Sequence, residues 1–116
     1  MEREIDSFIS YLHNIRKTSH NTEMSYRRDL TKLRIYLEIT AGSPEVHEVT
    51  KENLKRYIAY MERKKFKAST ISRSIASIRA FYHYLLKEGL VREDISECLK
   101  APKVKRKTPD ILSAEE

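Results

Sequence analysis

The chain has 116 residues, of which 40% are hydrophobic and 34% charged, enough for one folded domain with its own core. The single cysteine, Cys98, excludes an internal disulfide and a cysteine zinc cage, and no stretch is apolar for long enough to be a secretion signal or a membrane span. The net charge of +6 is uneven, because residues 1–50 carry 7 Lys or Arg against 8 Asp or Glu, whereas residues 51–116 carry 16 against 9. This distribution favours a polyanionic partner, most simply nucleic acid, over a membrane, and a reducing cytoplasmic location fits.

Two glycines, three prolines and apolar residues at helical spacing predict an all-α domain. Residues 2–15 predict a first helix, with acids in its first turns and Ile15 on its apolar side. Ser19 is a good N-cap for a second helix that runs to about residue 39. The core stripe of that helix is Tyr26, Leu30, Leu33 and Leu37, and its far side carries Asn21, Ser25, Arg28 and Lys32.

Residues 40–49 contain Gly42 and Pro44 and predict a loop, with Val46 and Val49 packed on the core. Thr50 is the expected cap of a third helix that ends in the charged residues 62–65. Its apolar side is Leu54, Tyr57, Ile58 and Met61.

Residues 66–90 predict a fourth helix, with Lys67 or Ser69 as its cap and Gly89 at its end. Its apolar stripe is Ile71, Ile75, Ile78, Tyr82 and Leu85. On a helical wheel the opposite face carries Ser69, Arg73, Ala76, Ser77, Ala80 and Tyr84, with Arg79 on the flank. Mostly short side chains around a central arginine suit either close helix packing or a nucleic-acid groove.

Residues 93–100 predict a short fifth helix with Ile95 and Leu99 inward, so we expect the domain to span residues 1–100. Residues 101–112 include four basic residues between two prolines and predict an extended basic linker. Ser113 and Glu116 have the spacing of a capping box, so residues 113–116 predict the start of a following domain.

No nucleotide-binding loop, metal cluster or nucleophile elbow occurs in the sequence, so we expect neither a metal nor a cofactor. The string from His13 to Arg16 matches the H-x-x-R pattern of some DNA-breaking sites, but no partner arginine or tyrosine accompanies it. Tyr26, Tyr57 and Tyr82 lie on apolar stripes and are interpreted as core residues. A self-contained active site is therefore not expected.

Several stretches occur together in an order that resembles a known family. They are residues 19–22 (Ser-His-Asn-Thr), 26–30 (Tyr-Arg-Arg-Asp-Leu), 49–54, 69–71 with 78–82, 87–90, and 101–103 leading to 108–116. This series is similar to the N-terminal core-binding, SAM-like domain of tyrosine recombinases, the phage integrase and Xer family. The resemblance covers nearly the whole chain.

The resemblance implies a four-helix orthogonal bundle that forms one half of a clamp on duplex DNA. It also implies other recombinase protomers as partners in a tetrameric synapse, and a catalytic domain that these residues do not include. By resemblance the second and fourth helices face the major groove, and Arg79 and the basic linker meet phosphates. The DNA-binding residues expected are Thr22, Ser25, Arg28, Lys32, Ser69, Arg73, Ser77, Arg79, Lys103, Lys105, Arg106 and Lys107.

Alternatives remain open at this level. A single helix before Ser19 favours the simpler Xer type, linked to chromosome dimer resolution, over a phage or mobile-element integrase. A SAM-like bundle can also be a protein-interaction module. Because Arg28 and Arg73 lie opposite the core stripes, their removal is expected to spare stability, and Arg3 and Arg16 of the first helix are expected to matter less for DNA binding.

Overall fold

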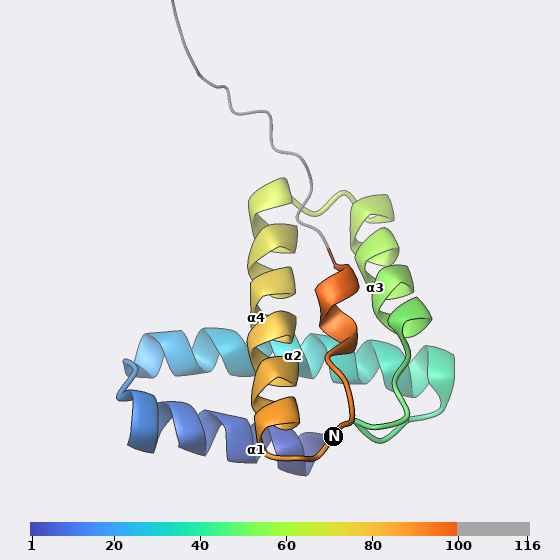
Figure 1. The fold of residues 1–116 in the computed structure, drawn as a ribbon. Helices are drawn as coiled ribbons and strands as arrows, with labels where there is room; N and C mark the ends of the chain where they lie inside the picture. The colour runs from blue at the N-terminus through green and yellow to red at the C-terminus, as the bar shows by residue number, and fades with distance from the viewer. Residues whose placement is uncertain (100–116) are drawn as a thin grey trace, which may run out of the picture.

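The computed structural model describes residues 1–99, in which every regular element is a helix and there is no strand. The elements are α1 (Glu2–Tyr11), the π-helix η1 (Leu12–Arg16), α2 (His20–Ala41), α3 (Lys51–Arg63), α4 (Ala68–Lys87) and the 3-10 helix η2 (Ile95–Cys98). In Figure 1, α1 and α2 run side by side, α3 and α4 run across them, and η2 lies between α3 and α4. The predicted all-α bundle with a short fifth helix is confirmed. The predicted linker and following helix, residues 101–116, lie outside the described residues.

The predicted caps Ser19 and Thr50 both begin their helices. Ser19 Oγ accepts a hydrogen bond from the backbone N–H of Thr22 at 3.2 Å. At α3, Thr50 Oγ1 accepts from the Asn53 N–H at 3.1 Å, and Asn53 Oδ1 accepts from the Thr50 N–H at 2.9 Å. Each bond satisfies an N–H that the first helical turn leaves without a backbone partner, so these residues fix where α2 and α3 start.

The helix ends also follow the sequence. Gly42 and Gly89 adopt left-handed backbone angles, φ of 73° and 76°, just after α2 and α4. A side chain is strained there, which is why glycine stops a helix at this position. Lys67 is the N-cap of α4 but provides no side-chain hydrogen bond.

The first predicted helix differs from the expectation in its last turn. Residues 12–16 form a π-helix, and Lys17 follows in a left-handed conformation with φ of 55°. Because a π-turn holds about one residue more than an α-turn, side chains after Leu12 rotate off the apolar stripe. The prediction that Ile15 faces the core is therefore wrong, since Ile15 is 66% exposed.

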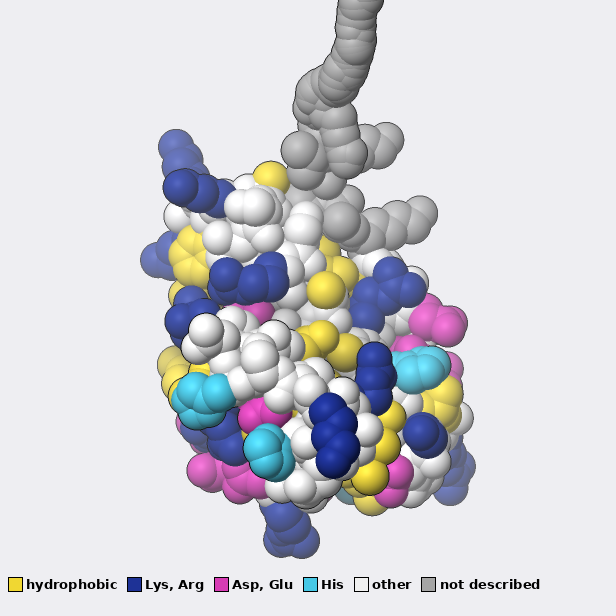
Figure 2. All heavy atoms as spheres, turned by 90° about the vertical axis from the view of Figure 1, so that its left-hand side faces the viewer, with side chains coloured by type: hydrophobic (Ala, Val, Ile, Leu, Met, Phe, Trp, Pro, Cys, Tyr) yellow, Lys and Arg dark blue, Asp and Glu magenta, His cyan; other side chains and the backbone are white. Residues whose placement is uncertain are grey.

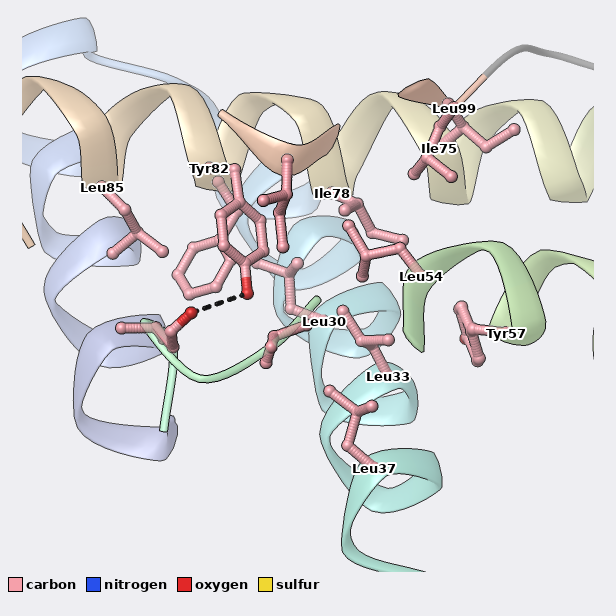
Figure 3. Packing of buried hydrophobic residues seen from close by; sticks show 14 of the residues in the cluster. Leu30, Leu33, Leu37, Leu54, Tyr57, Ile75, Ile78, Tyr82, Leu85 and Leu99 are labelled. Carbon is pink, nitrogen blue, oxygen red and sulfur yellow. Dashed lines mark hydrogen bonds between the residues drawn. The ribbon is translucent and has the colours of Figure 1, made fainter. Parts of the chain in front are cut away.

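One core joins all the helices (Figure 3). α2 contributes Leu30, Leu33 and Leu37, and side chains from α3, α4 and residue 99 belong to the same cluster. The Tyr82 hydroxyl donates to the backbone carbonyl of Val46 at 3.3 Å, which ties the loop after α2 to α4. The predicted inward residues Val46, Val49, Leu54, Tyr57, Ile58, Met61, Ile71, Ile75, Ile78, Tyr82, Leu85, Ile95 and Leu99 are all buried.

Candidate nucleic-acid interface

The four residues of α2 that are predicted to bind DNA form one row, which we call the α2 row: Thr22, Ser25, Arg28 and Lys32. Ser25 is half-buried and the other three are exposed, at spacings of three or four residues along the helix. Arg28 Nη2 donates to Ser25 Oγ at 3.4 Å. The Lys32 ammonium lies 5.9 Å from the centroid of the Phe66 ring, just before α4. This contact places the α2 row beside the start of α4.

The predicted residues of α4 divide into two groups. Ser69 and Arg73 are exposed one turn apart, at the end of α4 that lies near Lys32. Ser77 is only 3% exposed, so the prediction that it lies on an outward face is wrong. The reason is that α4 packs across α2 at this turn, and the short side chains of the helical wheel serve helix packing there rather than a groove.

A buried carboxylate holds the crossing of α2 and α4 together. Asp29 of α2 is 1% exposed and accepts three hydrogen bonds from α4. Arg73 Nε and Nη2 donate to its two oxygens, each at 3.2 Å, and Ser77 Oγ donates at 2.8 Å. The forked geometry of a guanidinium matches a carboxylate, so this contact fixes the position of the Arg73 side chain.

This contact changes what can be expected of Arg73. Its removal leaves a buried carboxylate with Ser77 as its remaining partner within residues 1–99, so it is expected to cost stability, contrary to the expectation from the helical wheel. The sequence analysis assigns no role to Asp29. The available signal was its register, because Asp29 lies three residues after Tyr26 and four before Leu33, on the side of α2 that faces the core.

Among the described residues, Arg79 is the predicted one that lies elsewhere. Arg79 lines a separate surface hollow of about 500 Å³, which Thr22 also lines. Lys103, Lys105, Arg106 and Lys107 lie outside the described residues. The structure thus brings together Ser25, Arg28, Lys32, Ser69 and Arg73, and Thr22 connects this group to Arg79.

The tyrosines predicted to be core residues are poor candidates for a nucleophile. Burial raises the pKa of the Tyr57 and Tyr82 phenols above the ordinary value, so both remain protonated at neutral pH. Tyr26 is half-buried and packs edge-on against Phe8, with ring centroids 5.6 Å apart. His13 Nδ1 lies 3.2 Å from Glu23 Oε2, which also accepts from Thr18 Oγ1 at 2.9 Å, so His13 and Glu23 link η1 to α2.

Within residues 1–99, no group of three or more His, Cys, Asp or Glu side chains is placed to hold a metal ion. None of the helices in this part of the chain is both long and apolar enough to cross a membrane.

Comparison with known families gives a match over residues 5–89 to the family described as phage integrase, N-terminal SAM-like domain. The chain belongs to this family. Its SAM-like fold is that of the family, with four helices in the described residues. No solved structure matches the chain significantly.

The family members most similar to this chain include proteins named tyrosine recombinase XerC and XerD. The chain is 31% identical to XerC of Natranaerobius thermophilus over 116 residues, which is 100% of this chain and 39% of that protein. It is 33% identical to XerC of Azotobacter vinelandii over 115 residues, which is 99% of the chain and 38% of the relative. XerD of Oceanobacillus iheyensis is 33% identical over 116 residues, again 100% of the chain and 39% of the relative. The chain therefore spans about two fifths of the length of these recombinases.

Proposed function

We propose that this domain binds duplex DNA at a recombination site, as the N-terminal half of a clamp in a site-specific tyrosine recombinase of the Xer type. The observation that carries the proposal is the joining of α2 and α4 into one basic surface. Lys32 contacts the Phe66 ring just before α4, and Asp29 binds Arg73, so Arg28 and Lys32 of the α2 row lie near Arg73 and the residues that lead into α4. We call this combined surface, Ser25, Arg28, Lys32, Ser69 and Arg73, the α2–α4 surface.

The charges of the α2–α4 surface are unequal in what they offer DNA. Arg73 shares its charge with the buried Asp29 carboxylate. Arg28 and Lys32 take part in none of the ion pairs found within residues 1–99. Cations without an acidic partner gain most from a phosphate, so Arg28 and Lys32 are expected to provide most of the affinity and Arg73 a fixed position.

The remaining parts of the proposal rest on similarity to the Xer recombinases. A further domain of the full protein supplies DNA cleavage and rejoining, and Lys103, Lys105, Arg106 and Lys107 add phosphate contacts. Protomers assemble as a tetramer on DNA. The reaction they carry out is chromosome dimer resolution or, as the second candidate, recombination of a phage or mobile element.

The test measures binding of the domain to a DNA duplex by fluorescence anisotropy at several salt concentrations. Arg28→Gln with Lys32→Gln is expected to weaken binding and to lower the slope of log affinity against log salt by about two units, because two phosphate contacts are lost. Both side chains are exposed, so the melting temperature is expected to change little.

The matched control is Lys55→Gln with Arg56→Gln, which removes the same charge from exposed positions of α3. If the α3 pair weakens binding as much as the α2 pair, the attraction is diffuse and the α2–α4 surface is not the DNA-binding face. Absence of salt-dependent binding altogether would favour a protein-interaction module.

A further inference from the structure

A second group of cations lies where η1 leads into α2. The hollow of about 500 Å³ that contains Arg79 opens between η1, the start of α2 and the second half of α4. Arg16 of η1 and Lys87 of α4 line it together with Arg79. Figure 2 faces the end of the molecule where η1 turns into α2, and shows Lys and Arg side chains from the top to the bottom of that face, with histidines among them.

The positive charge of this hollow is not cancelled by direct contacts. Within residues 1–99 none of the ion pairs involves Arg16, Arg79 or Lys87. Two acids, Asp94 and Glu97, also line the hollow. Asp94 Oδ1 accepts from the Ser96 N–H at 3.0 Å and so serves as the cap of η2. The three cations thus remain available to an anion from outside.

Two of these cations, Arg16 and Lys87, lie close to the side chain of Tyr11. Lys87 Nζ lies 5.4 Å from the centroid of the Tyr11 ring. The nearby Arg16 guanidinium, opposed by partial desolvation and aided by Lys87, lowers the pKa of the Tyr11 phenol. The cations of η1 and of α4 therefore converge on one spot although they are distant in the sequence.

Hydroxyl groups and position connect the hollow to the proposed DNA-binding surface. Thr18 and Thr22 line it, and Thr22 also belongs to the α2 row. Arginine, lysine, threonine and tyrosine side chains are among those that contact DNA phosphates in proteins. An anion bound in the hollow would be a neighbour of one bound along α2.

We propose that this hollow, which we call the η1–α4 site, is a second phosphate-binding site that takes the sugar-phosphate backbone of the duplex beyond the α2–α4 surface. Arg16, Arg79 and Lys87 bind the phosphate oxygens, and the hydroxyl of Thr22 adds a hydrogen bond. The inference rests on the proposed function and deepens it. The sequence predicts that Arg16 matters little for DNA binding, because its half of the chain has no net positive charge. The η1–α4 site instead makes Arg16 a direct phosphate contact.

The test uses the same anisotropy measurement on the whole domain. Arg16→Gln with Lys87→Gln is expected to lower the salt slope by about two units, whereas Lys55→Gln with Arg56→Gln leaves it unchanged. Arg16→Lys with Lys87→Arg keeps both charges and is expected to keep the slope. Arg16 and Lys87 are exposed, and circular dichroism checks that each variant is folded. If the glutamine pair does not fold, the two single variants are measured, each with an expected loss of about one unit.

The outcomes separate this inference from the proposed function. If the Arg16/Lys87 pair behaves like the α3 pair while the Arg28/Lys32 pair weakens binding, the η1–α4 site is overturned and the α2–α4 surface stands. If neither pair differs from the α3 pair, both are overturned. The site is supported if Arg16→Gln with Lys87→Gln lowers the salt slope below that of the wild type while Arg16→Lys with Lys87→Arg does not.

Discussion

Asp29 is the residue on which the geometry of the proposed DNA-binding surface depends. A carboxylate that is 1% exposed is costly to bury unless its oxygens are hydrogen-bonded, and here α4 supplies all three donors. Arg73, which supplies two of those donors, has a side chain that is 47% exposed and is part of the proposed DNA-binding surface. The same carboxylate that links two helices therefore orients a side chain offered to phosphate.

This link predicts coupled stability effects at positions 29 and 73. Asp29→Ala leaves the buried Ser77 hydroxyl without its acceptor, and Arg73→Ala leaves a buried carboxylate, so each is expected to cost about 1–3 kcal/mol. The double variant is expected to cost less than the sum, because the buried carboxylate that Arg73→Ala alone leaves behind is absent, although Ser77 still lacks its acceptor. Urea denaturation of the wild type, the two single variants and the double variant measures the coupling. Additive costs, to within about 0.5 kcal/mol, would show that the contact contributes little.

At the scale of elements, the sequence predicts best where one residue decides the outcome locally. Ser19 and Thr50 begin helices because their own hydroxyls accept the free N–H groups of the first turn. The π-turn of η1 has no such local signal, since His13, Asn14 and Ile15 are compatible with an ordinary helix. Which side of α4 is outward was decided by α2 crossing it, and a helical wheel contains no information about a neighbour.

The same reasoning explains what was and was not predictable in the candidate site. Arg28 and Lys32 are predicted correctly as outward cations because Leu30, Leu33 and Leu37 fix which side of α2 is buried. Ser77 was misplaced because serine is compatible with both faces of a helix. Arg16 is predicted to matter little because the net charge of a stretch of sequence counts only neighbours along the chain. The hollow instead brings together cations from segments that are far apart in sequence.

The core of α4 gives a direct test of the helical packing. Ile78 is 0% exposed, and Ile78→Ala is expected to lower the free energy of unfolding by about 2–5 kcal/mol, because a cavity remains where the side chain was. The matched control is Ile39→Ala on α2, where the side chain is 79% exposed and the expected change is below about 0.5 kcal/mol. Equal losses in urea denaturation followed by circular dichroism would contradict the described core.

For the whole molecule, two buried phenols make folding sensitive to alkaline pH. Burial raises the pKa of Tyr57 and Tyr82, while an unfolded chain has tyrosine pKa values of about 10. Above that value the unfolded state gives up protons that the folded state keeps, so stability falls as pH rises. Below a pH of about 10 both phenols are protonated in the folded and in the unfolded state, so their ionisation does not reduce stability there.

Tyr82→Phe tests this dependence. Phenylalanine cannot ionise, so between pH 9 and pH 11 the variant is expected to lose about 1 kcal/mol less stability than the wild type. At pH 9 the variant is itself less stable, because the hydrogen bond to the Val46 carbonyl is gone. Urea denaturation of both proteins at the two pH values measures the difference, and lysine deprotonation affects both alike. Parallel losses would mean that Tyr82 ionises as freely in the folded protein as in the unfolded chain.

The crossing of α2 and α4 also has a consequence for how such sequences diverge. Asp29 and Ser77 are 48 positions apart and Asp29 and Arg73 are 44 apart, yet all three share one set of hydrogen bonds. Replacing Asp29 leaves the buried Ser77 hydroxyl without its acceptor, and replacing Arg73 or Ser77 leaves the buried carboxylate with fewer donors. Joint replacement by apolar residues of similar volume leaves neither group. Substitutions at these three positions are therefore expected to co-vary among related sequences, although the positions are far apart in the chain.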